Sequence, residues 1–231
     1  MRHEREYIDD WLVKYDGQPV VRWKMLPRST AAVRTCIHLK GCNGSGKSTI
    51  PMQLLRLSKN REYFAARPNT TKPCGVYCPE LNLAIVGIYP EGTNCGGCDA
   101  VGDTQSVKTI LAALWRRDCH IMFEGVIVGD IKSTFYELMK AFNAVNRREL
   151  SICFMGTPLK ECLRRIQERN GGKPINETLV EQKYRNSLGH LKYYLDQGDI
   201  DVKVLNTSGT KVEVLRKFCE LYPLEGEWSR S

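Results

Sequence analysis

Short apolar runs alternate with helix-like patterns along most of the chain. Five runs contain few polar positions: residues 31–39, 81–89, 119–123, 150–155 and 201–205. Strands without regular polar alternation are typical of a sheet that is covered on both faces. Between these runs, apolar residues recur every three or four positions, which indicates helices. An alternation of strands and helices favours a parallel sheet, so the pattern predicts an α/β fold with a five-stranded parallel sheet sandwiched by helices.

The helical pattern covers six segments: residues 47–57, 105–115, 133–146, 159–169, 178–195 and 211–221. Residues 60–79 contain three prolines and are expected to be irregular, and residues 90–103 are expected to form a turn-rich loop. Residues 1–30 are expected to form an N-terminal extension. The 231-residue length is ample for one buried core, which we place in a single domain at residues 31–225.

The strongest motif is GCNGSGKST at residues 41–49, which matches the phosphate-loop pattern at every fixed position. Its glycines let successive backbone N–H groups turn toward phosphate oxygens, and the start of the following helix favours anions. Lys47 is expected to reach the β- and γ-phosphates, and the Ser48 hydroxyl to ligate Mg²⁺. The motif predicts a P-loop NTPase fold, nucleotide-kinase-like, that binds ATP with Mg²⁺. The predicted nucleotide-binding residues here are Gly41, Asn43, Gly44, Ser45, Gly46, Lys47, Ser48 and Thr49.

Two acidic residues that follow predicted strands are candidates for catalysis. Glu124 lies at the carboxyl end of a strand, where sheets of this kind bind ligands. A carboxylate there can hold Mg²⁺ or accept the proton of an attacking hydroxyl. Asp99 follows Gly96 and Gly97 in the second loop, and it is either a second candidate base or the cap of the next helix. The sequence leaves the choice between Glu124 and Asp99 as the base open.

An arginine-rich helix follows the fourth predicted strand. Arg165 and Arg169 lie one turn apart, with Arg164 beside them, and residues 170–172 (Asn-Gly-Gly) then end the helix. Small kinases close such segments over ATP, and their arginines neutralise charge on the transferring phosphoryl group. We expect Arg165 to act in catalysis and Arg169 to contact the nucleotide; the alternative is a solvated basic face.

The chain contains ten cysteines, four of which form two closely spaced pairs. Cys74 and Cys78 are separated from Cys95 and Cys98 by sixteen residues, which resembles the spacing of a four-thiolate zinc site. However, Cys95 and Cys98 also lie in the predicted substrate loop. Reduced, partly buried thiols are therefore favoured over zinc.

The net charge of +8 is concentrated in one segment. Residues 17–79 contain eleven Lys and Arg against one acid, a net charge of +10, whereas residues 1–16 carry −2 and residues 80–231 carry none. A triphosphate needs only part of this charge, so the segment indicates either DNA as a partner or a solvated basic face, and the charge alone leaves both open. No apolar run is long enough to span a bilayer, and the N-terminus lacks a secretory pattern, so no membrane partner and a cytoplasmic location are expected.

The order of these motifs resembles nucleoside and nucleotide kinases of the P-loop class. The CGGCD loop at residues 95–99 and the FEG segment at residues 123–125 are more narrowly similar to phage-encoded P-loop kinases, some of which are 5-hydroxymethyluracil DNA kinases. The resemblance covers residues 31–221. It implies ATP-dependent transfer to the 5-hydroxymethyl group of 5-hydroxymethyluracil in phage DNA, within the host cytoplasm. By the same resemblance, Lys47 and Ser48 handle phosphates and Mg²⁺, Glu124 or Asp99 is the base, and Arg165 or a neighbour neutralises transition-state charge.

Two other functions stay open from the sequence alone. One is a kinase of free nucleoside monophosphates; the other is a DNA-stimulated P-loop ATPase or a zinc-bearing DNA-binding module. Glu124-Gly125-Val126 lacks the Asp-Arg-Tyr or Glu-Arg-Ser motif that cellular deoxynucleoside kinases show at this point, which argues against an ordinary salvage nucleoside. The compact size and the arginine helix favour a kinase over a motor.

Overall fold

The computed structural model describes residues 14–15, 18–19, 34–65, 73–90, 96–125, 128, 134–144 and 147–224. Most of the predicted N-terminal extension lies outside this range. Within it, β1 (Lys14–Tyr15) pairs antiparallel with β2 (Gln18–Pro19). The boundary near residue 30 stays a prediction.

A seven-stranded sheet forms the centre of the molecule, in the order β4-β5-β6-β7-β3-β8-β9. The five predicted strands all exist and run parallel, but the predicted strand number is wrong because β4 and β5 extend the sheet antiparallel at one edge. These two strands come from the segment that its prolines marked as irregular. The strands are β3 (Thr35–Lys40), β4 (Glu62–Phe64), β5 (Gly75–Cys78), β6 (Leu83–Val86), β7 (His120–Glu124), β8 (Glu149–Met155) and β9 (Asp201–Leu205).

All six predicted helices are present, with ends shifted by three residues or fewer. Two short 3₁₀ turns, η1 (Pro79–Leu81) and η2 (Cys98–Ala100), precede β6 and α3. The helices are α2 (Thr49–Leu57), α3 (Thr104–Trp115), α5 (Thr134–Asn143), α6 (Leu159–Arg169), α7 (Glu177–Gln197) and α8 (Lys211–Leu221).

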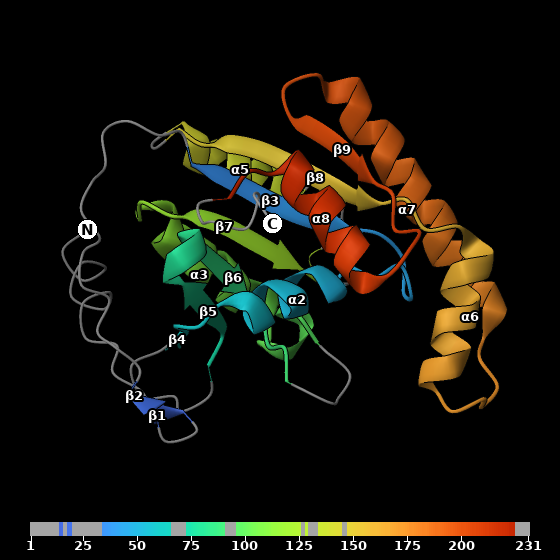
Figure 1. Ribbon diagram of the computed structural model, residues 1–231. Helices are drawn as coiled ribbons and strands as arrows, with labels where there is room; N and C mark the ends of the chain where they lie inside the picture. The colour runs from blue at the N-terminus through green and yellow to red at the C-terminus, as the bar shows by residue number, and fades with distance from the viewer. Residues whose placement is uncertain are drawn as a thin grey trace.

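Helices cover both faces of the sheet, because successive strand residues point to opposite sides. In β3, Cys36 joins the core beneath α3 and α5, whereas Ile37 joins the core beneath α2 and α8. In β7, Ile121 and Met122 divide in the same way. Figure 1 shows α2 and α8 on one face, with α3 and α5 behind the sheet. β3, β6, β7 and β8 are buried almost throughout, which explains the absence of polar alternation in these four segments, whereas β9 at the edge is mostly exposed or half-buried.

The register of the central strands places the functional loops together. β3 is the middle strand of the parallel set, and Leu39 pairs with Glu124 of β7 while Lys40 pairs with Phe154 of β8. The loop after β3 and the residue that ends β7 therefore meet at the carboxyl ends of the parallel strands. Across the described part of the chain, no helix combines the length and apolar character needed to cross a bilayer.

The core beneath α2 and α8 gives a stability prediction. Phe218 of α8 is fully buried there, whereas Val212 of the same helix is 71% exposed. Phe218→Ala removes a ring and leaves a cavity, so we expect the free energy of unfolding to fall by about 3–5 kcal/mol. The control Val212→Ala should change it by less than about 0.5 kcal/mol. Equilibrium denaturation followed by circular dichroism measures both, and equal losses would contradict this assignment of the core.

Candidate active site

The phosphate loop joins β3 to α2 and packs directly on α6. Gly44 has a φ of +77°, and a Cβ there would overlap the carbonyl oxygen of Cys162, so this close approach requires glycine. The Thr157 hydroxyl donates to the Ser45 carbonyl at 2.7 Å and also hydrogen-bonds the Thr207 hydroxyl. The loop is therefore held from the β8 and β9 side as well as by its own helix.

Lys47 lies over the loop with its ammonium turned inward. Its Nζ donates to the carbonyl oxygens of Gly41 at 2.7 Å and Cys42 at 3.0 Å, and the side chain is nearly buried. Lys47 also lines the cleft in front of the loop, where it could contact phosphate oxygens. This geometry fits the predicted role of Lys47.

Ser48 and Glu124 connect the loop to β7. The Ser48 hydroxyl donates to Oε1 of Glu124 at 2.9 Å, and Glu124 is only 3% exposed. Burial raises the pKa of the Glu124 carboxyl; the Lys47 charge and the hydrogen bonds from Ser48 and Tyr89 oppose this shift, whereas the Asp99 charge adds to it. A buried carboxylate with a raised pKa can accept a proton from a substrate hydroxyl.

Asp99 lies beside Glu124 and does not cap α3. The cap is Asp103, whose carboxylate accepts from the Ser106 amide at 2.6 Å. Asp99 instead lines the same cleft as Glu124, and a Cβ on Gly125 would lie 2.8 Å from its Oδ1. The helix-cap interpretation of Asp99 is therefore wrong, because a residue four positions later takes that role.

The second loop crosses over the end of β7 at very short range. Gly97 has a φ of +51°, and a Cβ there would overlap Oε1 of Glu124. Ile88, which follows β6, forms a bridge with Gly97 through a 3.0 Å backbone hydrogen bond. Only glycine permits this approach, which positions the loop directly over the carboxylate.

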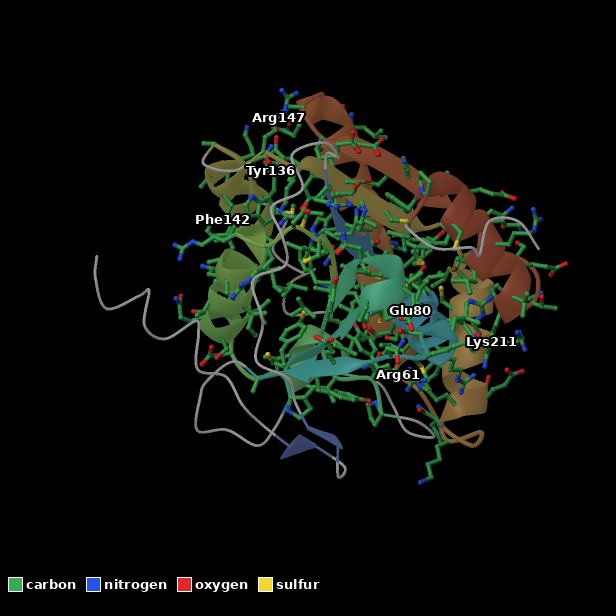
Figure 2. All side chains as sticks on the ribbon, turned by 60° about the vertical axis from the view of Figure 1, so that its left-hand side comes forward. Arg61, Glu80, Tyr136, Phe142, Arg147 and Lys211 are labelled. Carbon is green, nitrogen blue, oxygen red and sulfur yellow. The ribbon has the colours of Figure 1, made fainter. Side chains whose placement is uncertain are left out.

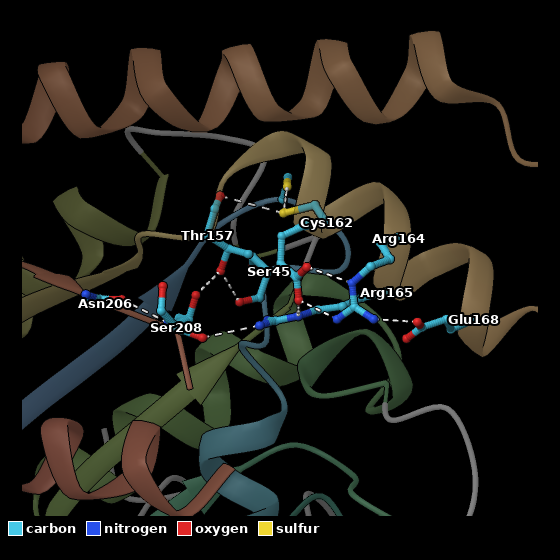
Figure 3. Close-up of polar contacts among 11 residues, drawn as sticks. Ser45, Thr157, Cys162, Arg164, Arg165, Glu168, Asn206 and Ser208 are labelled. Carbon is cyan, nitrogen blue, oxygen red and sulfur yellow. Dashed lines mark hydrogen bonds and ion pairs between the residues drawn. The ribbon is translucent and has the colours of Figure 1, made fainter. Parts of the chain in front are cut away.

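The arginines of α6 divide into inward and outward groups. Nε of Arg165 donates to Glu161 at 2.7 Å, and its NH2 donates to the Thr207 carbonyl at 3.2 Å. Figure 3 shows Arg165 extending from α6 toward the loop that carries Asn206 and Ser208. Arg164 points away and forms ion pairs with Glu161 and Glu168. Arg165 therefore lies near the phosphate loop, where a Cβ on Gly46 would be 3.3 Å from its NH1.

A cleft of about 700 Å³ unites these groups. The phosphate loop, Glu124 and Asp99 line one side of it, and the other side is formed by α6, including Arg165 and Arg169, and by the start of α8. Thr210 caps α8 in a reciprocal capping box with Glu213. The cleft thus brings together the predicted catalytic residues and most of the predicted nucleotide-binding residues, whereas Gly41 and Ser45 do not line it.

The residues present fit a triphosphate with Mg²⁺. Ser48 and Glu124 offer a hydroxyl and a carboxylate oxygen, and Mg²⁺ prefers such ligands together with phosphate oxygens and water. Among the described residues, no group of three or more His, Cys, Asp or Glu is placed to hold a metal by itself. A bound Mg²⁺ would therefore draw its remaining ligands from the nucleotide and water.

The cysteine pairs do not form a zinc cluster in the described part of the chain. The Sγ of Cys74 lies 3.3 Å from the Phe64 carbonyl, and that of Cys98 lies 3.6 Å from the Val86 carbonyl. Burial raises the pKa of Cys78 to about 11. Among the described residues, these cysteines do not belong to any group of three or more potential metal ligands. The fourth predicted ligand, Cys95, lies outside the described residues.

The basic segment 17–79 is only partly available to a polyanion. Nε of Arg34 donates to Asp118 at 2.7 Å, and both side chains are largely buried. Arg56 and Lys59, at the end of α2, are exposed. Arg22, Lys24, Arg28, Arg67 and Lys72 lie outside the described residues.

Sequence reasoning missed the residues that support the site. Glu161 holds both Arg164 and Arg165, and Tyr89 hydrogen-bonds Glu124. The spacing of Glu161 four residues before Arg165 is a detectable signal for a helical ion pair. The orientation of Tyr89 has no such signal, because it depends on how the chain turns after β6.

The strand order, the phosphate loop and the buried carboxylate together define a P-loop phosphotransferase of the kinase class. The family model for 5-hmdU DNA kinases (5-hmdU is 5-hydroxymethyldeoxyuridine) matches residues 19–199, and the chain belongs to this family. A 5-hmdU DNA kinase of Pseudomonas phage M6 is 39% identical over 156 residues, which cover 64% of this chain and 79% of the relative. The 5-hmdU DNA kinase 1 of Salmonella phage ViI is 31% identical over 156 residues, which cover 66% of this chain and 67% of the relative.

Two solved kinase structures also align with most of the chain. A shikimate kinase from Acinetobacter baumannii in complex with shikimate is 17% identical with a TM-score of 0.41, covering 81% of this chain and 92% of that one. A deoxyadenosine kinase from M. mycoides with bound dATP is 12% identical with a TM-score of 0.37, covering 81% and 98%. At this similarity, the fold assignment depends on the topology and the phosphate loop described above.

The environment of Glu124 gives a pH prediction for stability. Because its pKa is raised, the folded protein binds this proton more tightly than the unfolded chain, so this contribution to stability is lost as pH rises through the raised pKa. Glu124→Gln removes the titration. We therefore expect the free energy of unfolding of the variant, relative to that of wild type, to be higher at pH 8 than at pH 5. Denaturation at both pH values measures this, with the exposed Glu149→Gln as control. A larger relative gain at pH 5 would contradict a raised pKa.

Proposed function

We propose that this protein transfers the γ-phosphoryl group of ATP to the 5-hydroxymethyl group of 5-hydroxymethyluracil in DNA. The observation that carries the proposal is the buried Glu124 carboxylate hydrogen-bonded to Ser48 of the phosphate loop, in a chain that belongs to the 5-hmdU DNA kinase family. The names of the phage relatives support the acceptor. The location proposed for such an enzyme is the host cytoplasm.

The residues of the phosphate loop and α6 would bind the nucleotide. Backbone amides of residues 41–49 and the Lys47 ammonium would hold the β- and γ-phosphates, and Ser48 with Glu124 would hold Mg²⁺, which neutralises phosphate charge when bound. Arg165 lines the cleft beside the loop, so it is placed to neutralise charge on the transferring group. Arg169, one turn further along α6, would contact the nucleotide.

Glu124 is the favoured general base: burial raises its pKa, and the charge of the neighbouring Asp99 carboxylate adds to this shift. In the proposed step, the substrate hydroxyl gives its proton to Glu124 while its oxygen bonds to the γ-phosphorus. The bond between that phosphorus and the bridging oxygen breaks, which leaves ADP and a phosphomonoester on the base. The close packing of Gly97 over Glu124 limits the approach of water to the carboxylate.

The direct test offers γ-labelled ATP with DNA that contains 5-hydroxymethyluracil, with ordinary DNA and with free nucleoside monophosphates. We expect label in the modified DNA alone. Lys47→Ala should reduce transfer to background, because it removes a phosphate contact, while the circular dichroism spectrum stays unchanged. Label in a free nucleotide instead, or DNA-stimulated hydrolysis without a labelled acceptor, would overturn the proposed acceptor; an active Lys47→Ala variant would overturn the site.

A kinetic comparison separates the two roles of Glu124. If it is the base, Glu124→Gln should lower kcat by about 10²–10⁴-fold and leave the KM for ATP nearly unchanged. Asp99→Asn, measured in parallel, should lower kcat less. A rise in the KM for Mg·ATP with kcat intact would assign Glu124 to the metal alone, and a larger loss in Asp99→Asn would make Asp99 the base.

A further inference from the structure

A second cavity of about 400 Å³ lies, like the nucleotide cleft, at the end of the sheet where the parallel strands have their carboxyl ends. Its walls come from α2, from the hairpin of β4 and β5, and from the turn after β6. Gly75 pairs with both Phe64 and Val86, so the end of β4, the start of β5 and the end of β6 meet here. The volume is within the range of small-ligand pockets.

The cavity walls carry two arginines and two tyrosines on an apolar base, and no carboxylate lines them among the residues that the structure describes. Arg56, in the last turn of α2, is exposed, and it forms no ion pair within the described ranges. Arg61, labelled in Figure 2, donates from its Nε to the Ser58 carbonyl at 3.3 Å, its one hydrogen bond to a described residue. Tyr63 and Tyr89 are partly buried.

This wall chemistry fits a ligand that is both planar and anionic. Aromatic rings stack on any nucleobase, and arginine side chains bind phosphate oxygens through paired N–H groups. The absence of an acidic lining residue in the described walls disfavours a cation. A single nucleotide unit of a DNA strand combines a planar base with a phosphodiester on each side.

Tyr89 links this cavity to the proposed catalytic carboxylate. Its hydroxyl lies 3.3 Å from the Val86 carbonyl and hydrogen-bonds Glu124, which itself lines the nucleotide cleft. A Cβ on Gly87 would come within 2.9 Å of this hydroxyl, so the turn after β6 packs closely around it. Tyr89 thus lines the second cavity and contacts Glu124, which lines the nucleotide cleft.

We propose that the second cavity is the acceptor site, which receives the target base after it leaves the DNA stack. This inference rests on the proposed function. The base would stack on Tyr63 and Tyr89 with its hydroxymethyl group toward Glu124, while Arg56 and Arg61 hold the adjoining phosphodiester. A base inside a duplex cannot reach a pocket of this kind, so extrusion of the nucleotide is part of binding.

The test measures kcat/KM for DNA containing 5-hydroxymethyluracil, together with the KM for ATP, in variants of the cavity walls. Arg56→Ala, Arg61→Ala and Tyr63→Leu should each lower kcat/KM for the DNA by about 5- to 100-fold while the KM for ATP stays within about twofold. Tyr63→Phe keeps the ring and should retain activity. Arg116→Ala is the matched control. This exposed arginine follows α3 and precedes β7, so it lies at the amino end of that strand, away from the cavity.

The outcomes separate this inference from the proposed function. If wild-type protein does not label modified DNA, the proposed function fails, and the same variants assayed with whichever nucleotide is labelled then decide the cavity assignment. If wild type labels the DNA but the cavity variants match Arg116→Ala, the function stands and the acceptor site is wrong. Equal losses for Tyr63→Leu and Tyr63→Phe, or a matching rise in the KM for ATP, would also overturn the assignment.

Discussion

The hydrogen bond from Ser48 to Glu124 is the contact on which the site depends. It joins the phosphate loop to the end of a neighbouring strand, and it exists because Leu39 and Glu124 are paired in a parallel register. Burying a carboxylate is costly unless hydrogen bonds and a nearby positive charge compensate. Ser48, Tyr89 and Lys47 supply these, and the pKa of Glu124 is still raised, so the group is held in a state from which it readily takes a proton.

Close backbone packing turns this contact into an enclosed site. Gly97 passes over Glu124, and Gly44 packs on Cys162 of α6. Both approaches are so close that a Cβ at either glycine would overlap its neighbour. The first approach covers the carboxylate, and the second fixes the loop against the helix that carries Arg165. The positions of the acid and the arginine relative to the loop are thus set by contacts between chain segments rather than by long side chains, which have more freedom to move.

The four inner parallel strands were predictable because they are buried on both faces and therefore appear in the sequence as apolar runs. The β4–β5 hairpin was not, since β5 has only four residues and lies between Pro73 and Pro79, which is too short a stretch to give a periodic signal. Lys47, Ser48 and Glu124 could be placed because each follows directly from a motif or a strand end. Whether Asp99 caps a helix or lines the cleft could be decided only once the first residue of α3 was known, since Asp103 is the N-cap. The orientation of Tyr89 likewise depends on the turn after β6, which the sequence does not define.

The two strands that the sequence did not reveal bear on the difference between hydrolysis and transfer. A phosphate loop and a carboxylate are sufficient for an ATPase, because water needs no binding wall. Transfer to a base needs a second surface that holds the acceptor within reach of the carboxylate. The β4–β5 hairpin forms one wall of the second cavity, to which exposed Arg56 of α2 adds positive charge, and we infer that this cavity is that surface. The arginines of the basic segment therefore differ in role. Arg56 and Arg61 line the second cavity. Arg34 instead forms an ion pair with Asp118 at the amino ends of β3 and β7.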